Sequence, residues 1–585
     1  MKFSFLICIL TAVVAFAEST GEDVVLKAMQ DEMARSMEKL QIENAEKPYF
    51  IQYLVSTQEA IRIGAKFGAL TESNRVRSRS FQVGVRIGNY GFDDSGLMTR
   101  ETIGAMAQGG YESLVLEADY EALRHRIWLA TDDAYKQALE RYSLKQAFVK
   151  NKVEKETLPD FTKEVPVDGI LPLKELNVNQ AEWEKKVREW SAIFRKYGSI
   201  QESEVRLDIT VVHEYLLNSE GTRIRRPFHL LHLNVSASTQ SIEGVRLQRS
   251  VPLYTVTPEQ IPSAESVAAW IETFAQELTE LRNAVSATEV YSGPALFTGQ
   301  AAAEMIAQVF VPHLSGQRSP LVEDERVLSY MGLKESELIQ RIGRPVLPDF
   351  ISVKDDPTVQ TFDTKALIGN YSFDDEGVPA SSVQIVENGI LRNLLNSRSL
   401  PRKETDRSNG HGRWSNVAIL PHIGNLFIET THGKSDEELK QELRSICRAQ
   451  NLPYGILIRS LQENSFGGFQ DLMSRMLSGP GASGANVSAP VLAYRIYTED
   501  GREELIRGIQ GGSVSLRALR DIVAAGNHPY VHQLKISNNR NPFSQSSGQP
   551  ASIVSPALLL EEIELQPRSG SQEKPSILSH PYFQK

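Results

Sequence analysis

Hydrophobic positions in the first 150 residues change from a helical to a strand period and back again. In residues 22–42 they recur at spacings of three and four, which predicts an amphipathic helix. Residues 49–55 and 81–87 favour half-buried antiparallel strands, and apolar side chains alternate along the second segment. One apolar face then runs through residues 120–150. The pattern therefore predicts a helix, a pair of strands and a second helix.

The middle of the chain continues this mixture. Three prolines in a polar stretch indicate a linker or an extended crossing at about residues 155–175. Aromatic residues at helical spacing in residues 183–197 indicate a helix with a core-facing stripe, and residues 199–255 are rich in strand patterns. Further helices are predicted at residues 264–283 and 300–311.

Strands dominate from about residue 343 onward. They are separated by loops rich in glycine at residues 409–412, 467–468 and 479–484. Asp500-Gly501 lies between two apolar segments, and both positions favour positive φ, so a hairpin is predicted there. Ser513 is placed to cap a helix that ends at Gly526.

Runs of helices and runs of strands without regular alternation predict an α+β protein. A length of 585 residues favours more than one packed unit. We expect an N-terminal helix-plus-antiparallel-sheet region over residues 18–290 and a β-rich region over residues 291–565. Residues 566–585 are rich in Ser, Gln, Pro and Lys and are predicted to be a disordered tail.

Charge and composition narrow the class of partner. Lys and Arg number 63 and Asp and Glu number 73, which gives a net charge of −10. A chain of this charge offers no global basic field to phosphate backbones, so the sequence argues against nucleic acid as a partner. Hydrophobic residues make up 41% and charged residues 23%, as in soluble globular proteins.

The N-terminus resembles a secretory signal peptide. Lys2 precedes an apolar run over residues 3–17, which is too short to span a membrane and ends in small residues. Cleavage is expected after Ala17. No later segment reaches 18 consecutive apolar residues, so we expect a periplasmic or secreted protein without a membrane segment. Cleavage removes Cys8 and leaves Cys447, which excludes an internal disulfide.

Histidine pairs lack the spacing of a zinc site. His213-Glu214 has no second histidine one turn later, and its surroundings indicate a strand. His528 and His532 are four residues apart, but Pro529 between them prevents a shared helical face. Metal binding is therefore not indicated by spacing alone.

Runs of carboxylates are the other candidates, and they are Asp93-Asp94, Asp355-Asp356 and Asp374-Asp375-Glu376. Each run adjoins Ser, Pro or Gly in a turn context, which favours a solvated or backbone-capping role over an acid/base pair. Cys447 lies in a helical pattern, so a packing role is predicted for it. A Gly-x-Ser-x-Gly nucleophile motif is absent from the sequence. Site chemistry alone therefore nominates no enzyme.

Several ordered motifs carry a family resemblance. Residues 369–379 read Gly-Asn-Tyr-Ser-Phe-Asp-Asp-Glu-Gly-Val-Pro, and residues 386–391 read Val-Glu-Asn-Gly-Ile-Leu. Asp-Pro precedes them at 356–357, and Leu-Ile-Arg-Gly-Ile-Gln-Gly-Gly follows at 505–512. Over residues 292–565, this order resembles the C-terminal region of the TldD/PmbA family of zinc-metallopeptidase-related proteins.

The resemblance implies where a zinc site would lie. The active TldD-type subunit carries His-Glu-x-x-x-His on a helix and a later cysteine that completes the site. The matching helix here is residues 295–311, and the three motif positions are Ile306, Ala307 and Val311. The cysteine is expected within residues 538–549, which contain none. Apolar side chains supply no lone pair, so a zinc site of the family type cannot form in this chain.

The family also contains ligand-less members of the PmbA or TldE type, which assemble with the active subunit, and this sequence resembles that type. The resemblance implies no cofactor in this chain, zinc in a TldD-type partner of a hetero-oligomer, and a peptide substrate. The retained motifs supply the candidates for peptide binding or a scaffold role: Asp374, Asp375, Glu376, Gly377, Arg507 and Gly508.

Two alternatives stay open from the sequence. The first is a self-sufficient metallopeptidase with a rearranged site, for which the candidate ligands are Glu304, His313, His528 and His532. The second is a non-catalytic peptide-binding or scaffold protein with no peptidase partner.

Overall fold

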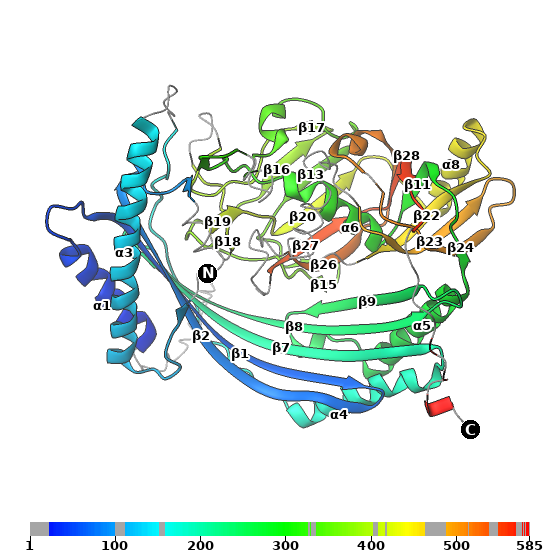
Figure 1. Cartoon of the computed structure of the whole chain (residues 1–585), viewed down its shortest axis with the longest axis horizontal. Coiled ribbons are helices and arrows are strands. Elements are labelled where there is room, and N and C mark those ends of the chain that lie inside the picture. Colours follow the sequence, from blue (N-terminus) through cyan, green and yellow to red (C-terminus); the bar gives the residue numbers. More distant parts are fainter. Residues whose placement is uncertain are drawn as a thin grey trace, which may run out of the picture.

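Figure 1 shows a computed structural model of the chain. It describes residues 23–99, 112–150, 158–325, 328, 335–401, 407–415, 418–462, 487–512, 514–536, 548–568, 576, 578 and 581–583. The expected signal peptide, two of the glycine-rich loops, the cap at Ser513 and most of the tail lie outside the described residues. So do residues 538–547 of the cysteine-free stretch.

An eight-stranded sheet, which we call the first sheet, forms the N-terminal half of the described chain. Its strands are β1 (Pro48–Lys66), β2 (Ala69–Asn89), β3 (Phe92–Asp93), β5 (Glu112–Ser113), β6 (Asp168–Ile170), β7 (Ile200–Asn218), β8 (Arg223–Gln240) and β9 (Arg246–Thr255). The long strands lie antiparallel in the order β2-β1-β7-β8-β9. Figure 1 shows this sheet curving beneath the C-terminal half. The strands predicted at residues 49–55 and 81–87 lie within β1 and β2 and pair with each other.

Four helices cover the outer face of the first sheet: α1 (Val24–Lys39), α3 (Tyr120–Lys150), α4 (Gln180–Ala192) and α5 (Ala264–Asn283). Odd-numbered side chains of β1 face these helices, with Ile51 packing under α1 and α3 and Ile61 under α4 and α5. Even-numbered side chains such as Gln52 therefore face the C-terminal half. Among the described helices, none is long and apolar enough to cross a membrane.

Two further sheets form the C-terminal half. The second sheet has the order β10-β24-β23-β22-β11-β28-β25-β21, and the third has the order β17-β16-β13-β20-β27-β26. The second sheet comprises β10 (Val285–Ser286), β11 (Tyr291–Phe297), β21 (Gly433–Lys434), β22 (Tyr454–Leu461), β23 (Pro490–Tyr497), β24 (Glu503–Arg507), β25 (Ile522–Gly526) and β28 (Leu558–Leu565). The third sheet comprises β13 (Ile351–Asp355), β16 (Val383–Glu387), β17 (Ile390–Leu391), β20 (Asn425–Thr430), β26 (Tyr530–Ile536) and β27 (Gln549–Ser555).

Helix α6 (Gln300–Val309) lies between the second and third sheets and contributes to the largest apolar core, while α8 (Asp436–Ala449) covers the other face of the second sheet. Cys447 of α8 is buried, which confirms its packing role. Three small two-stranded pairs complete the described sheets: β4 (Leu97–Met98) with β12 (Leu321–Val322), β14 (Thr361–Phe362) with β15 (Lys365–Ala366), and β18 (Gly412–Ser415) with β19 (Ala418–Pro421). The described 3-10 helices are η1 (Ile193–Lys196), η2 (Pro258–Gln260), η3 (Val311–His313), η4 (Glu337–Arg341), η5 (Leu516–Asp521) and η6 (Pro581–Phe583). Helices and sheets are both abundant and do not alternate regularly, so the α+β class is confirmed.

Local signals placed several elements correctly. Helices α3 and α5 begin and end at the predicted residues. Ser263 caps α5 by accepting a hydrogen bond from the Ser266 backbone N–H. The hairpin at Asp500-Gly501 is also confirmed, because it joins β23 to β24 and Gly501 has φ +76°.

Two helix predictions were wrong in part. The helix matched to residues 295–311 starts only at Gln300, because residues 291–297 form β11 between β22 and β28. The helix predicted from Ser513 to Gly526 is instead η5 followed by strand β25. Pairing of β25 with β28 satisfies its backbone groups and buries Ile522. This pairing is remote in sequence, so local periodicity could not reveal it.

Candidate functional site

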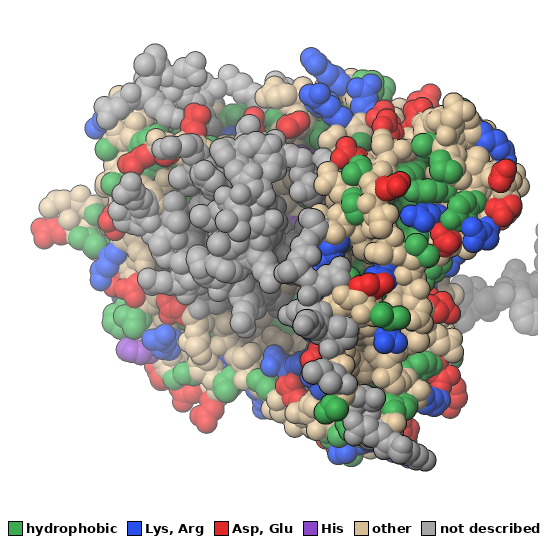
Figure 2. All heavy atoms as spheres, turned by 45° about the vertical axis from the view of Figure 1, so that its right-hand side comes forward, with side chains coloured by type: hydrophobic (Ala, Val, Ile, Leu, Met, Phe, Trp, Pro, Cys, Tyr) green, Lys and Arg blue, Asp and Glu red, His purple; other side chains and the backbone are tan. Residues whose placement is uncertain are grey.

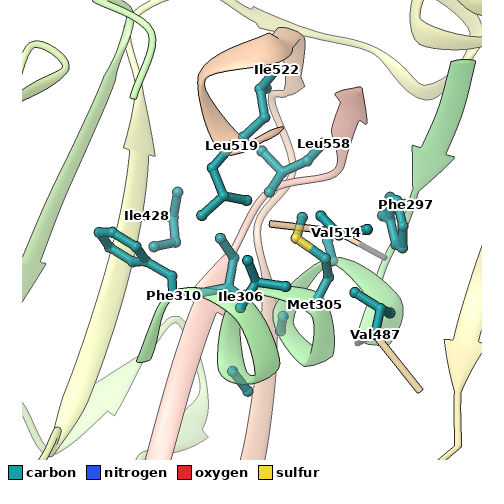
Figure 3. Close-up of a cluster of buried hydrophobic side chains, with 14 of the residues drawn as sticks. Phe297, Met305, Ile306, Phe310, Ile428, Val487, Val514, Leu519, Ile522 and Leu558 are labelled. Carbon is teal, nitrogen blue, oxygen red and sulfur yellow. The ribbon is translucent and has the colours of Figure 1, made fainter. Parts of the chain in front are cut away.

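The motif positions on α6 lie inside the core between the two C-terminal sheets. Ile306 is 1% exposed and Ala307 is 3% exposed. Figure 3 shows Ile306 and Phe310 pointing toward Leu519 of η5 and Ile428 of β20. Val311 lies just past α6, in η3, and packs against the same core. None of these three apolar side chains carries a lone pair for a metal, so the positions serve packing.

Glu304 lies on the polar side of α6 and is committed to structural hydrogen bonds. Its Oε1 accepts from Gln300 Nε2 at 2.6 Å, and its Oε2 accepts from the Leu461 backbone N–H at 2.8 Å. One turn later, Gln308 Oε1 accepts from the Ser488 backbone N–H at 2.7 Å. The polar side of α6 therefore holds the end of β22 and the residues that precede β23.

The three candidate histidines lie on different segments from Glu304. His313 belongs to η3, and burial lowers the pKa of its imidazole. His532 belongs to β26, and burial lowers its pKa to about 4, whereas His528 is exposed in the turn before that strand. Within the described ranges, no group of three or more His, Cys, Asp or Glu side chains is arranged to hold a metal ion.

The carboxylates Asp374, Asp375 and Glu376 form a buried turn. Asp374 Oδ1 accepts from the backbone N–H groups of Glu376 and Val378, both at 2.9 Å, and its Oδ2 accepts from the Gly412 N–H at 2.9 Å. The predicted backbone-capping role is thus confirmed for Asp374. A solvated position was wrong, because Asp374 is 1% exposed.

Asp375 is held by arginines from two sheets. Arg226 of β8 pairs with its Oδ1, and Arg413 Nε of β18 lies 3.6 Å from its Oδ2. The Trp414 backbone N–H also donates to that oxygen at 2.6 Å. Burial opposes ionisation, but Arg413 and Arg226 outweigh it and lower the pKa of Asp375. The same arginine of β8 also pairs with Glu214 of β7 at 2.6 Å.

Glu376 shares its surroundings with Asp374. Its Oε2 accepts from the Arg398 backbone N–H at 2.6 Å. Burial, together with repulsion between the two carboxylates, raises the pKa of Asp374 to about 7, and burial raises the pKa of Glu376 to about 7. A Cβ atom at Gly412 would lie 2.7 Å from Glu376 Oε2 and 3.1 Å from Asp374 Oδ2, so only glycine allows both carboxylates to approach this backbone.

Arg398 connects this turn to the N-terminal half. Its side chain is 0% exposed, and its guanidinium lies 3.9 Å from the centre of the Phe161 ring. Arg398 Nη2 donates to Glu220 Oε1 at 2.7 Å, in the turn between β7 and β8, and Nε donates to the Thr162 carbonyl at 2.9 Å. Thr162, within the stretch predicted as a linker, is thus hydrogen-bonded to the C-terminal half.

Gly377 allows the turn at residues 374–377 to pack against the face of the first sheet that is turned toward the C-terminal half. Gly377 has φ +80°, and a Cβ atom there would lie 2.8 Å from Thr222 Cγ2. Gln52 Nε2 of β1 also donates to the Asp375 carbonyl at 3.0 Å. The cluster is therefore closed to solvent and binds the two halves of the chain to each other.

Arg507 and Gly508 lie at a second contact between the halves. Arg507 Nη2 donates to Glu243 Oε2 at 2.5 Å, between β8 and β9, and Nε donates to the Ala284 carbonyl at 2.9 Å. Gly508 has φ +75°, which lets the chain turn directly after β24. The candidate scaffold residues thus form two separate contacts rather than one cleft.

Sequence reasoning missed the strongest members of this network. Arg398 and Arg226 lie outside the recognised motifs, and their partners are far away in sequence. A buried pair was also missed, in which His411 Nε2 lies 2.9 Å from Asp355 Oδ2. The carboxylate Asp355 was a candidate and His411 was not. The glycines flanking His411 in the sequence were the available signal for close backbone approach.

Comparison with known proteins supports the expected resemblance. Residues 290–566 match the family model described as the PmbA/TldA metallopeptidase C-terminal domain. The C-terminal half thus resembles that domain. A metalloprotease from Archaeoglobus fulgidus is 32% identical over 137 residues, which is 23% of this chain and 29% of the relative. One from Methanothermobacter thermautotrophicus is 37% identical over 113 residues, or 19% and 23%. The matches therefore span less than a third of either relative.

Solved structures extend the likeness beyond residues 290–566, which we call the PmbA/TldA-like half. TldE from Thermococcus kodakarensis gives a TM-score of 0.55 at 15% identity, covering 92% of this chain and 99% of that chain. A protein described as a modulator of a DNA gyrase, from Thermotoga maritima, gives 0.57 at 18% identity with the same coverage. At these identities the likeness shows a shared fold, which includes the first sheet and its helices.

Proposed function

We propose that this protein is an exported, zinc-less subunit that supports peptide hydrolysis by a zinc-bearing relative of the same fold. The observation that carries the proposal is the environment of α6, where Ile306 and Ala307 occupy the motif positions and are buried between two intact sheets. This supports the proposal, because core side chains occupy the positions that the family resemblance assigns to metal ligands. A chain that keeps the fold but lacks metal ligands fits the role of a non-catalytic partner subunit.

The surroundings of the remaining candidate ligands favour this reading over a rearranged metallopeptidase. Activating a water with zinc needs three or four converging ligands. Glu304 already accepts two hydrogen bonds, and His313 and His532 lie on other elements. In the proposed complex, the zinc-bearing relative supplies the water activation and the general base.

Peptide binding by this chain would use its backbone. Among the described strands, β26 is an end strand of the third sheet and pairs with β27 alone. An extended peptide can add to such an edge by main-chain hydrogen bonds, without any catalytic side chain. The proposed substrate of the complex is therefore a peptide in an extended conformation.

The test compares the mature chain alone, an exported relative with an intact His-Glu-x-x-x-His motif alone, and the two co-expressed. We expect this chain to contain no stoichiometric zinc and to cleave no peptide by itself. We expect it to co-elute with the relative in gel filtration and to raise the peptidase activity of the mixture. Protein recovered from the native host should begin near Glu18, and N-terminal sequencing tests this.

The matched control is the same complex in which the motif glutamate of the relative is changed to glutamine, which should abolish cleavage. Chelator-sensitive cleavage by this chain alone, lost in Glu304→Gln or His532→Asn, would establish the rearranged site instead. Two separate gel-filtration peaks, with the relative equally active alone, would favour the scaffold alternative. An N-terminus at Met1 would contradict export.

A further inference from the structure

Three arginines from two distant segments line one pocket of the PmbA/TldA-like half. Arg341 ends η4, Arg344 lies in the loop before β13, and Arg520 belongs to η5. With Pro345 they line a cavity of about 310 Å³, at the lower end of the range of small-molecule sites. Figure 2 shows a group of Lys and Arg side chains at the top of this half, the side on which Figure 1 places β17.

The positive charge of this pocket is not neutralised by the described part of the chain. None of the three arginines, Arg341, Arg344 and Arg520, forms an ion pair or a side-chain hydrogen bond with a described residue. Other exposed arginines of the C-terminal half behave differently, since Arg392 pairs with Glu387 at 3.0 Å and Arg459 pairs with Glu503 at 3.0 Å. Three unneutralised guanidinium groups around one cavity repel one another, which is an unfavourable arrangement unless an anion joins them.

The backbone under these arginines is fixed before any ligand arrives. Gly343 has φ +82°, and the Arg344 backbone N–H donates to the Arg341 carbonyl at 2.9 Å, which closes a tight turn. The Arg344 carbonyl accepts from the Leu391 N–H at 3.0 Å. On the other wall, Leu519 is fully buried in the core next to Arg520. The pocket is therefore held by the core that surrounds α6.

We propose that this pocket binds a compact anion with several oxygen atoms, a phosphate or a carboxylate group, between Arg341, Arg344 and Arg520. Guanidinium groups present paired N–H donors that match such oxygens. The bound anion would connect the loop that precedes β13 of the third sheet to η5, which precedes β25 of the second sheet. Because it binds only the folded chain, it raises the stability of the protein. This inference is independent of the proposed function.

The test titrates the full mature chain with sodium phosphate, pyrophosphate, succinate and citrate at constant ionic strength, with chloride as the reference ion. We expect calorimetric binding and a rise in the thermal unfolding midpoint with at least one of these anions. In Arg344→Gln and Arg520→Gln the apparent dissociation constant should rise about tenfold or more, because a charged hydrogen-bond partner is removed. Phosphates alone or carboxylates alone acting in this way would identify the class of ligand.

Arg517→Gln is the matched control, since Arg517 is exposed on η5 and does not line the pocket. It should bind like the unmodified chain. Without added anion, Arg344→Gln and Arg520→Gln should unfold at the same or a higher temperature, because repulsion is relieved. The proposal is overturned if none of the four anions binds, or if both pocket variants bind as tightly as the Arg517 control.

Discussion

Asp374 and Glu376 occupy a turn from which water is excluded, and this governs their protonation. Each carboxylate accepts backbone hydrogen bonds, which stabilise the ionised form, yet burial prevails, and repulsion from Glu376 adds to it at Asp374. Their neighbour Asp375 faces two arginines and keeps a lowered pKa. The pKa values of adjacent carboxylates in one turn are therefore shifted in opposite directions, because their partners differ.

The raised pKa values predict a dependence of stability on pH. Both values are about 7 in the folded chain, against ordinary values of 3.8 and 4.5, so the folded state binds more protons between about pH 4 and pH 7. The contribution of this pair to stability is therefore lost as the pH rises through that window. Glu376→Gln removes one titrating group and the repulsion. The difference in unfolding free energy between the variant and the unmodified chain should therefore grow in favour of the variant, by at least ~1 kcal/mol, as the pH rises from 5 to 8.

Urea unfolding at pH 5, 6, 7 and 8 measures this difference. Glu561→Gln is the control, because Glu561 is exposed on β28. Asp375 does not contribute to this pH dependence, because its lowered pKa makes its protonation change the stability only below the pH range measured. A Glu376→Gln variant whose stability follows the same pH curve as the unmodified chain would show that the pair is not protonated in the folded state.

At the scale of elements, η5 and α6 explain why the motif positions are closed. The 3-10 helix places Leu519 over Ile306, and β25 follows at once to pair with β28. Ile306 and Ala307, to which the family resemblance would assign metal ligands, are both buried in this core.

Leu519→Ala should destabilise the protein by about 2–5 kcal/mol, because it removes a fully buried side chain and leaves a cavity against α6. The free energy of unfolding from urea titration measures this cost. Leu516→Ala, at a half-buried position of the same 3-10 helix, should cost clearly less. Equal losses for the two variants would contradict the packing assigned to Leu519.

At the scale of the whole molecule, two arginines of the C-terminal half, Arg398 and Arg507, add charged contacts to those that Arg226 and Gln52 of the first sheet make with Asp375. Arg398 reaches Glu220 and Thr162, and Arg507 reaches Glu243. In the first contact the side chain of Arg398 is 0% exposed and that of Glu220 is 6% exposed, so losing one member of this ion pair leaves a largely buried, uncompensated charge. The relative position of the halves therefore depends on a few charged groups as well as on apolar packing.

Arg398→Met should cost about 3–5 kcal/mol, since it strands Glu220 in a buried site. Hydrogen exchange should accelerate around Thr162 and in the β7–β8 turn before it changes in the core around α6. The control is Arg392→Met, which breaks an exposed pair with Glu387 and should cost no more than about 1 kcal/mol. Unchanged exchange around Thr162 in Arg398→Met would show that the halves are held by other contacts.

Local chemistry determined much of this protein. The apolar period predicted α3 and α5, and Asp500-Gly501 predicted a hairpin, because each signal acts over a few neighbouring residues. The sequence also showed that Ile306 and Ala307 cannot bind zinc, since a missing lone pair needs no structure to recognise.

Only the tertiary structure decided the rest. The end of η5 became a strand because β28, far along the chain, supplies its hydrogen bonds. The turn at Asp374 was predicted to be solvated or backbone-capping. It caps backbone N–H groups but is buried, because Arg398 and Arg226 reach it from other segments of the chain. Arg341 and Arg520 likewise meet at one pocket although about 180 residues separate them. Burial and charge at these sites arise from contacts between distant segments, which sequence periodicity does not encode.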